Sequence, residues 1–179
     1  MTPVLGFTGF SGSGKTTLLA AIISRLSARG LRIGLVKHSH HAFDIDHPGK
    51  DTFRHREAGA FEVVVASSRR LALMREFEQE AQPSVHQLIA ELHEGVDWVL
   101  VEGFKDSNLL KVEVWRPSAG QPARYAEDPF IVAIATDEPA GLPEPTLRPV
   151  LDIDDPEAMA QWQPTMAIAS TTTRRTTHE

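Results

Sequence analysis

The segment GFSGSGKT at residues 9–16 constrains this 179-residue chain more than any other feature. It matches the pattern G-x-x-x-x-G-K-[ST] in full, follows an apolar run at residues 4–8, and precedes apolar residues at helical spacing from Leu18 to Leu26. Backbone N–H groups at the start of a helix bind phosphate, because that end of a helix carries partial positive charge. A plain glycine turn would not explain a lysine and a hydroxyl at these positions. We therefore expect a strand, a phosphate-binding loop and a helix.

Individual residues of this loop have separate expected roles. The Lys15 ammonium would neutralise β- and γ-phosphate oxygens, and the Thr16 hydroxyl would ligate Mg²⁺. Glu102 ends the apolar segment 96–101 and would hold the same ion, either as a direct ligand or through contact with another ligand of the ion. The alternative is that Glu102 is a surface acid at the end of a strand. These three residues are the candidate catalytic residues, and Thr16 and Glu102 are the candidate metal ligands. The residues expected to bind the phosphates are Gly9, Ser11, Gly12, Ser13, Gly14, Lys15, Thr16 and Thr17.

The pattern of apolar runs predicts the fold class. A second strand at residues 32–36 completes a strand–helix–strand unit, which implies a parallel sheet with a right-handed crossover. Further strands are expected at 61–66, 71–77, 96–101, 111–115 and 131–135, and short helices at 51–58, after Pro83 and at 155–162. The prediction is an α/β P-loop NTPase: a mostly parallel sheet flanked by helices, with an added antiparallel β-hairpin. Residues 1–165 would form one nucleotide-binding domain and 166–179 a disordered tail.

Histidines and aspartates crowd the segment that follows the second strand. Five histidines lie there: His38, His40, His41, His47 and His55. Ligands of open α/β sheets bind at this end of the strands, so the loop is expected to bind phosphate. A Zn²⁺ or Ni²⁺ site and a solvated loop with incidental histidines are the two other interpretations. The candidate binding residues are Lys37, His38, Asp46, Lys50 and Asp51.

Recognition of the nucleotide base is less clear from the sequence. The guanine-reading tetrapeptide N-K-x-D does not occur in the chain. Asp137 follows the apolar run 131–135 and could accept the N1 and N2 protons of guanine. The segment TDEP at 136–139 is equally compatible with an ordinary turn.

Composition excludes several classes of function. The formal net charge is −6 and the sequence pI is about 5.7, so no overall positive field attracts nucleic acid or anionic lipid. The chain has no cysteine, which excludes disulfides and thiolate chemistry. No apolar run approaches the roughly 18 residues of a membrane helix, and the first residues do not resemble a signal peptide. We therefore expect a soluble cytoplasmic protein.

Several short motifs in register resemble the MobB family, the molybdopterin-guanine dinucleotide biosynthesis protein B family. The resemblance covers roughly residues 4–155 and rests on FSGSGKTTL at 10–18, KH at 37–38 with His41, DID at 44–46, PGKD at 48–51, AGA at 58–60, LVEGFK at 100–105 and KVEV at 111–114. It implies GTP binding with weak hydrolysis, a homodimer, and an accessory role beside the guanylyltransferase that joins GMP to molybdopterin. It also places residues 12–17 on the phosphates, Glu102 near Mg²⁺, and the loop 37–51 toward a second ligand, molybdopterin.

Two other functions remain open at this point. A small-molecule or nucleotide kinase also opens with such a loop, and Arg54, Arg56, Arg69 and Arg70 could serve it as a lid. A nickel-type metallochaperone GTPase would use the histidines, although the absence of cysteine counts modestly against it. For the expected homodimer, the alternating segment 111–115 could be an exposed edge strand that pairs across a symmetry axis.

Overall fold

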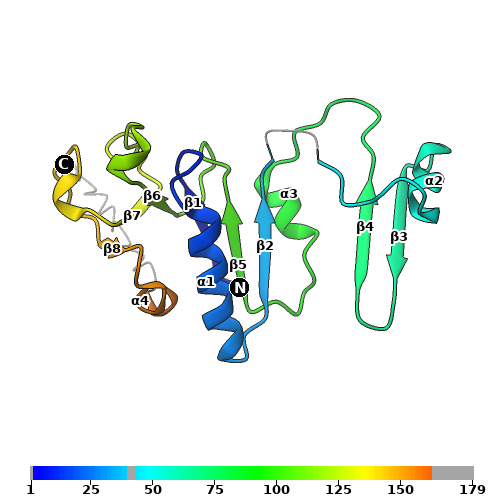
Figure 1. Ribbon diagram of the computed structural model, residues 1–179, viewed down its shortest axis with the longest axis horizontal. Helices are drawn as coiled ribbons and strands as arrows, with labels where there is room; N and C mark the ends of the chain where they lie inside the picture. Colours follow the sequence, from blue (N-terminus) through cyan, green and yellow to red (C-terminus); the bar gives the residue numbers. More distant parts are fainter. Residues whose placement is uncertain (1, 40–42, 163–179) are drawn as a thin grey trace, which may run out of the picture.

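The computed structural model describes residues 2–39 and 43–162, and its centre is a six-stranded sheet whose strand pairs are all parallel. Figure 1 shows this sheet and its helices. The elements are β1 (Val4–Thr8), α1 (Lys15–Ala28), β2 (Ile33–Lys37), α2 (Asp51–Glu57), β3 (Glu62–Ala66), β4 (Leu71–Arg75), α3 (Val85–Ala90), β5 (Trp98–Glu102), β6 (Lys111–Val114), β7 (Ile131–Thr136), β8 (Val150–Asp152) and α4 (Pro156–Gln161). The strand order is β2-β5-β1-β6-β7-β8. The predicted tail at 166–179 lies outside the described residues.

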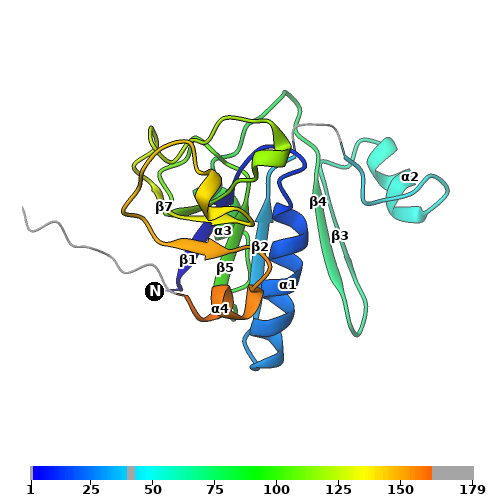
Figure 2. The same ribbon diagram turned by 60° about the vertical axis from the view of Figure 1, so that its left-hand side comes forward.

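Helices cover both faces of this sheet, and the sequence of β5 shows why (Figure 2). Leu100 belongs to the core that α1 and α4 cover, whereas Val99 and Val101 pack in the core that includes Val85 of α3. Successive residues of a strand point to opposite faces, so a strand that is buried on both faces needs a continuous apolar run. Each such buried side chain contributes about 1.5–3 kcal/mol. This packing fixes β5 as a central strand that ends at Glu102.

The strand register brings the candidate site residues together at one edge of the sheet. Phe7 of β1 lies opposite Glu102 of β5, and Lys37 of β2 lies opposite the same glutamate. The loop 9–14 leaves β1 at this edge and leads directly into α1. Parallel pairing therefore places a lysine, a carboxylate and the phosphate loop side by side.

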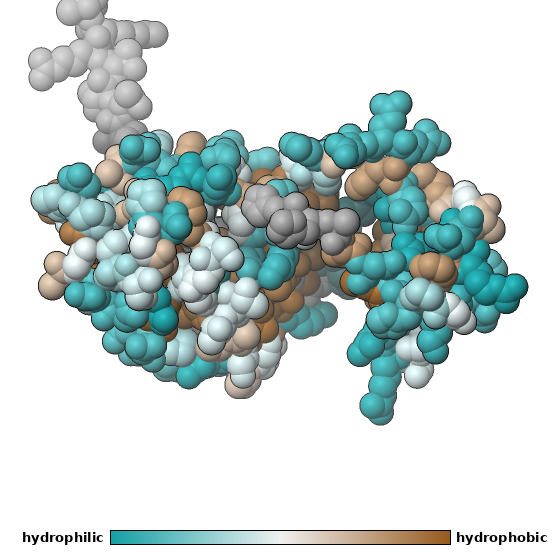
Figure 3. Space-filling view, turned by 45° about the horizontal axis from the view of Figure 1, so that its top comes forward, coloured by the Kyte–Doolittle hydropathy of each residue, from teal (hydrophilic) through white to brown (hydrophobic). Residues whose placement is uncertain are grey.

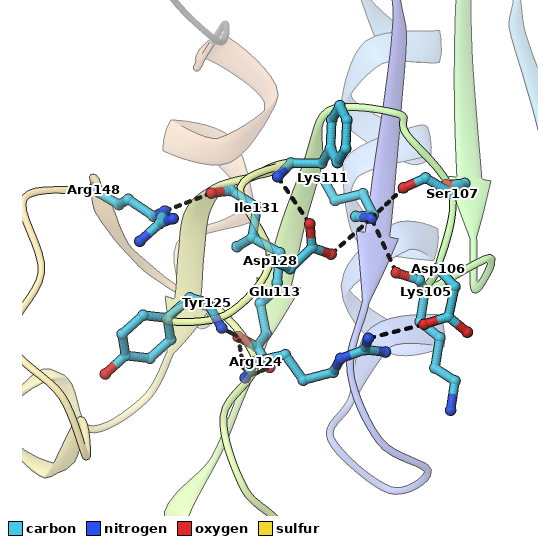
Figure 4. Close-up of polar contacts among 11 residues, drawn as sticks. Lys105, Asp106, Ser107, Lys111, Glu113, Arg124, Tyr125, Asp128, Ile131 and Arg148 are labelled. Carbon is cyan, nitrogen blue, oxygen red and sulfur yellow. Dashed lines mark hydrogen bonds and ion pairs between the residues drawn. The ribbon is translucent and has the colours of Figure 1, made fainter.

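The interpretation of segment 111–115 as a half-exposed edge strand is wrong. β6 pairs with β1 on one side and β7 on the other, and all four of its residues are buried. Its polar residues Lys111 and Glu113 are each only 1% exposed. Backbone N–H groups of Arg124 and Tyr125 donate to the Glu113 carboxylate at 2.8–3.0 Å (Figure 4). Alternation of polar and apolar residues here reflects buried polar partners, so β6 cannot pair with a second subunit.

A separate antiparallel sheet of two strands is formed by β3 and β4, as the sequence predicts. Together with α2 and the connecting loops it makes up residues 43–77, which we call the arm. Figures 1 and 2 both show the arm beyond β2, outside the main sheet. An ion pair of 3.0 Å between Arg75 of β4 and Glu91 connects it to the end of α3. The arm thus carries most of the histidine- and aspartate-rich segment away from the sheet.

Two further observations complete the fold. The sequence predicts a loop at residues 139–149 and no strand after it, whereas in the structure β8 follows that loop and pairs in parallel with β7. None of the described helices has the length and apolar character needed to cross a bilayer.

Candidate nucleotide-binding site

The phosphate loop adopts a backbone that only glycine adopts readily. Gly9, Gly12 and Gly14 have φ of +140°, +82° and +92°. At Gly9 the approach is also close, because a Cβ atom there would lie 2.3 Å from the carbonyl oxygen of Val114. Gly14 is the N-cap of α1, so the loop ends where the positive end of a 14-residue helix begins. The glycines therefore permit the backbone conformation that a cradle of amides at residues 12–16 would need.

Lys15 bridges its own loop. Its Nζ donates a hydrogen bond of 2.7 Å to the carbonyl oxygen of Phe10. Burial lowers the pKa of Lys15 below its ordinary 10.5; the charge of Glu102 raises it in part, and that of Lys37 lowers it further. A phosphate oxygen would offer this ammonium a stronger, charged acceptor than the carbonyl does.

Thr16 and Glu102, the two candidate metal ligands, are in direct contact. The Thr16 hydroxyl donates a hydrogen bond of 2.8 Å to Oε1 of Glu102, and the Lys37 ammonium lies 3.2 Å from the same oxygen. Glu102 is buried, with 7% of the residue exposed. A hydroxyl and a carboxylate are the oxygen ligands that Mg²⁺ prefers, so this pair fits the ion. Lys37 would compete with Mg²⁺ for the carboxylate, because both are cations.

Arg116, which the sequence did not single out, lies near Gly14 at the end of the phosphate loop and pairs with Asp137, the candidate base-reading residue. Nε of Arg116 lies 3.2 Å from Oδ2 of Asp137, and its Nη2 lies 3.9 Å from Oδ1 of Asp154. Arg116 also lines a cavity of about 270 Å³ with Gly14 and Thr17 of the phosphate loop region. The only sequence signal was a basic residue directly after an apolar strand. Asp137 therefore lies near the phosphate loop through Arg116.

Of the candidates from the histidine-rich loop, Lys37 and His38 lie at the site, whereas Lys50 and Asp51 do not. The backbone N–H of His38 donates to the carbonyl oxygen of Glu102 at 3.0 Å, and its ring packs at 4.8 Å from the Phe104 ring. Lys50 and Asp51 begin α2 in the arm, and they do not line the cavity at the phosphate loop. His40 and His41 lie outside the described residues. Within those residues, no three His, Cys, Asp or Glu side chains gather as a metal site.

Asp46 takes part in a charge cluster inside the arm. Its carboxylate accepts from the Thr52 hydroxyl at 2.9 Å and from Nε of Arg56 at 3.3 Å. Arg56 also pairs with Asp44 at 2.8 Å and with Glu76 at 2.6 Å. The pKa of Asp44 is lowered, first by the backbone N–H of Asp46 and then by Arg56. These contacts tie the loop, α2 and the end of β4 together; a role for Asp46, Lys50 and Asp51 in ligand binding stays a prediction.

Comparison with known proteins agrees with this architecture. The MobB family model, described as molybdopterin guanine dinucleotide synthesis protein B, matches residues 4–137. A molybdopterin-guanine dinucleotide biosynthesis adapter protein of Escherichia coli (strain K12) is 42% identical over 164 residues, which cover 90% of this chain and 91% of that protein. The crystal structure of Bacillus subtilis MobB has a TM-score of 0.68 at 26% identity, over 91% of this chain and 99% of that one. A MobB homolog from Bacillus stearothermophilus has a TM-score of 0.64 at 28% identity, over 89% and 93%.

Proposed function

The chain belongs to the MobB family of molybdopterin-guanine dinucleotide synthesis proteins, and from that premise we propose that it is a GTP-binding adapter in the synthesis of this dinucleotide. The observation that carries GTP binding is the combination of the glycine-shaped cradle with Lys15 and the contact between Thr16 and Glu102. The amides of residues 12–16 would bind the phosphates of GTP, and the Thr16 hydroxyl and Glu102 would hold Mg²⁺. The bound ion would neutralise phosphate charge.

Hydrolysis of the bound GTP is expected to be slow. Phosphoryl transfer depends on positioning and on charge stabilisation, and often on a residue that orients the attacking water. Glu102 already accepts the Thr16 hydrogen bond and pairs with Lys37, so it is engaged in holding the metal site. Lys15 supplies charge at the phosphates but cannot act as a base while it is protonated. The chain is thus arranged to hold a triphosphate more than to cleave it.

We assign guanine recognition to Asp137. Its carboxylate is the acidic group that follows β7, and Arg116 holds it close to the loop that ends at Gly14. A carboxylate can accept both the N1 and the N2 protons of guanine, whereas adenine presents no such pair of donors. This would give a preference for GTP over ATP.

A homodimer is the proposed assembly, and the arm is its proposed interface. Val64 lies opposite Leu73 in the hairpin and shares a face with Leu71, and all three side chains are exposed. Figure 3 shows apolar patches among the polar side chains of the arm, the right-hand part of that view. A hairpin of two strands is only marginally stable by itself, and its apolar face is exposed here. We therefore propose that a second copy of the chain covers this face. Light scattering at micromolar concentration should give a dimer mass, and Val64→Glu a monomer mass; a monomeric native protein contradicts this.

Molybdopterin is the proposed second ligand, and the guanylyltransferase that joins GMP to it is the proposed partner. The adapter role predicts that adding this protein raises the yield of the dinucleotide from that enzyme. Lys15→Ala should remove the effect, because the substitution removes the ammonium at the phosphates.

Calorimetric titration with GTP and ATP, with and without Mg²⁺, tests the nucleotide part. We expect GTP to bind more tightly than ATP and Mg²⁺ to strengthen binding. Asp137→Ala should reduce the affinity for GTP to that for ATP. The control is Asp97→Ala, which directly precedes β5 at the end away from Glu102 and should change neither the GTP affinity nor the ATP affinity. Equal affinities in the native protein would contradict guanine recognition, and the absence of any nucleotide binding would overturn the proposed function.

A further inference from the structure

A cavity of about 690 Å³ lies at the phosphate loop, and neither Arg116 nor Asp137, beside which the base would lie, is among its lining residues. Lys15, Ser11 and Glu102 line its near part, and residues 82–86 and 104–108 line the rest. Arg116 and Thr17 line a different cavity. A nucleotide that runs from Lys15 toward Arg116 would therefore leave most of the larger cavity empty. Its γ-phosphate would face that remaining space.

One wall of this cavity is held by a buried lysine. Nζ of Lys111 donates to the carbonyl oxygens of Lys105 at 3.0 Å and of Ser107 at 2.6 Å, and it pairs with Asp128 at 2.9 Å (Figure 4). Burial of an ammonium is unfavourable unless it is fully paired, as it is here. Phe104 in the same wall has φ of +49°, the one positive φ among the described non-glycine residues. Strained backbone of this kind persists where the surroundings fix it, often at binding sites. The contacts of Lys111 therefore fix the backbone carbonyls of Lys105 and Ser107 in this wall.

The cavity lining combines apolar and polar side chains. The Phe104 ring packs against His38 and against the core cluster that includes Val85, which also lines the cavity. Among the polar lining residues, Nε2 of His86 and Oδ1 of Asn108 lie 3.0 Å apart in a hydrogen bond. Ser107 also lines the cavity, and its buried Oγ has no hydrogen-bond partner in the described part of the chain. A buried hydroxyl without a hydrogen-bond partner is uncommon, and a bound ligand could supply the missing hydrogen bond.

We propose that this cavity beyond Lys15 binds a planar fused-ring heteroaromatic molecule of the pterin class, which faces the γ-phosphate of bound GTP. Flat rings pack well against aromatic side chains, and the amide-like edge of a pterin complements His86, Asn108 and the Ser107 hydroxyl. An acidic substituent of the ligand would be attracted to Lys105, which also lines the cavity. The inference rests on the proposed function, because the cavity is free for a second ligand only if the guanine base of GTP lies at Asp137. It assigns the second ligand to residues outside the loop 37–51, apart from His38 at the start of that loop.

The test titrates 6-hydroxymethylpterin into protein loaded with Mg²⁺ and a GTP analogue that is not hydrolysed. We expect pterin to bind alongside the analogue. Asn108→Leu should weaken pterin binding about tenfold through the lost hydrogen bonds, and Ser107→Ala should weaken it less. Gln79→Leu, the same kind of change at an exposed residue outside the cavity, should leave it unchanged.

Separate outcomes distinguish this inference from the proposed function. If the GTP analogue binds but pterin does not, the cavity assignment is wrong and GTP binding stands. Displacement of pterin by guanosine, or equal pterin affinity in Asn108→Leu and the native protein, would also overturn the assignment. If the analogue itself does not bind, the proposed function fails first.

Discussion

Lys111→Met removes the ammonium that joins β6 to the loop before it, while it keeps a side-chain stem of similar shape. In the native protein this ammonium has three acceptors, which are the carbonyl oxygens of Lys105 and Ser107 and the carboxylate of Asp128. Methionine fills the space of the stem, so no large cavity forms. The cost of the substitution is therefore electrostatic.

The magnitude follows from what the ammonium leaves behind. The Asp128 carboxylate is only 12% exposed and would lose its cation, and two carbonyl oxygens would lose their donor. Removal of one partner from a buried ion pair costs about 3–5 kcal/mol. Asp128→Asn in the same chain removes the stranded charge, while its Oδ1 can still accept from the N–H of Phe130 at 2.9 Å in the native geometry. The double variant should therefore recover about 1–3 kcal/mol.

Urea unfolding followed by circular dichroism measures these free energies of unfolding. The native protein, both single variants and the double variant form a complete cycle. Lys105→Met, which changes an exposed lysine of the same loop, is the control and should lie within about 0.5 kcal/mol of the native protein. A cost below about 1 kcal/mol for Lys111→Met, or no recovery in the double variant, would refute the reasoning.

Three further predictions concern charged groups of the site and core. Lys37→Met removes the cation 3.2 Å from Glu102, so Mg²⁺ should bind about three- to tenfold more tightly to the GDP-bound protein; an unchanged magnesium titration contradicts this. Burial raises the pKa of Glu113 above its ordinary 4.5, so the folded protein binds more protons just above that pH and its stability falls as pH rises through the raised pKa. Glu113→Gln should flatten this slope in urea unfolding at a series of pH values, and an equal slope in both proteins would be evidence against it. Arg116→Ala releases Asp137 and should reduce the calorimetric preference for GTP over ATP about three- to tenfold, with ATP affinity as the internal reference.

The phosphate loop and the sheet could be predicted because their requirements are local. Positive φ at Gly9, Gly12 and Gly14 needs glycine at those positions, and the continuous apolar run of β5 needs burial on both faces. Two such local patterns, a loop that opens a helix and an acid that ends a central strand, mark Thr16 and Glu102 as candidate metal ligands, and the fold brings the two side chains into contact. The glycines of the loop and the apolar run of β5 can each be recognised from neighbouring residues alone.

The polar residues of β6 could not be interpreted in the same way. A period-two pattern usually means that one face is wet, but Lys111 finds Asp128 and Glu113 finds the N–H groups of Arg124 and Tyr125 in a later loop. Nothing in the local pattern reveals such partners.

Long-range pairing also limited the prediction of the histidine-rich loop and the base site. Asp46 pairs with Arg56, which in turn pairs with Glu76 at the end of β4. Arg116 could be linked to the base site only through its ion pair with Asp137, which directly follows β7. In both cases the sequence shows the charges, and only the fold shows which of them meet.

The central claim is that the amides of residues 12–16 hold a triphosphate, and an NMR titration of ¹⁵N-labelled protein with GTP and Mg²⁺ tests it most directly. We predict that the largest amide shifts fall on Gly12, Ser13, Gly14, Lys15 and Thr16, and that Lys15→Ala abolishes them. Saturating GTP that leaves these five amides unchanged, or that shifts only amides elsewhere, would contradict the account.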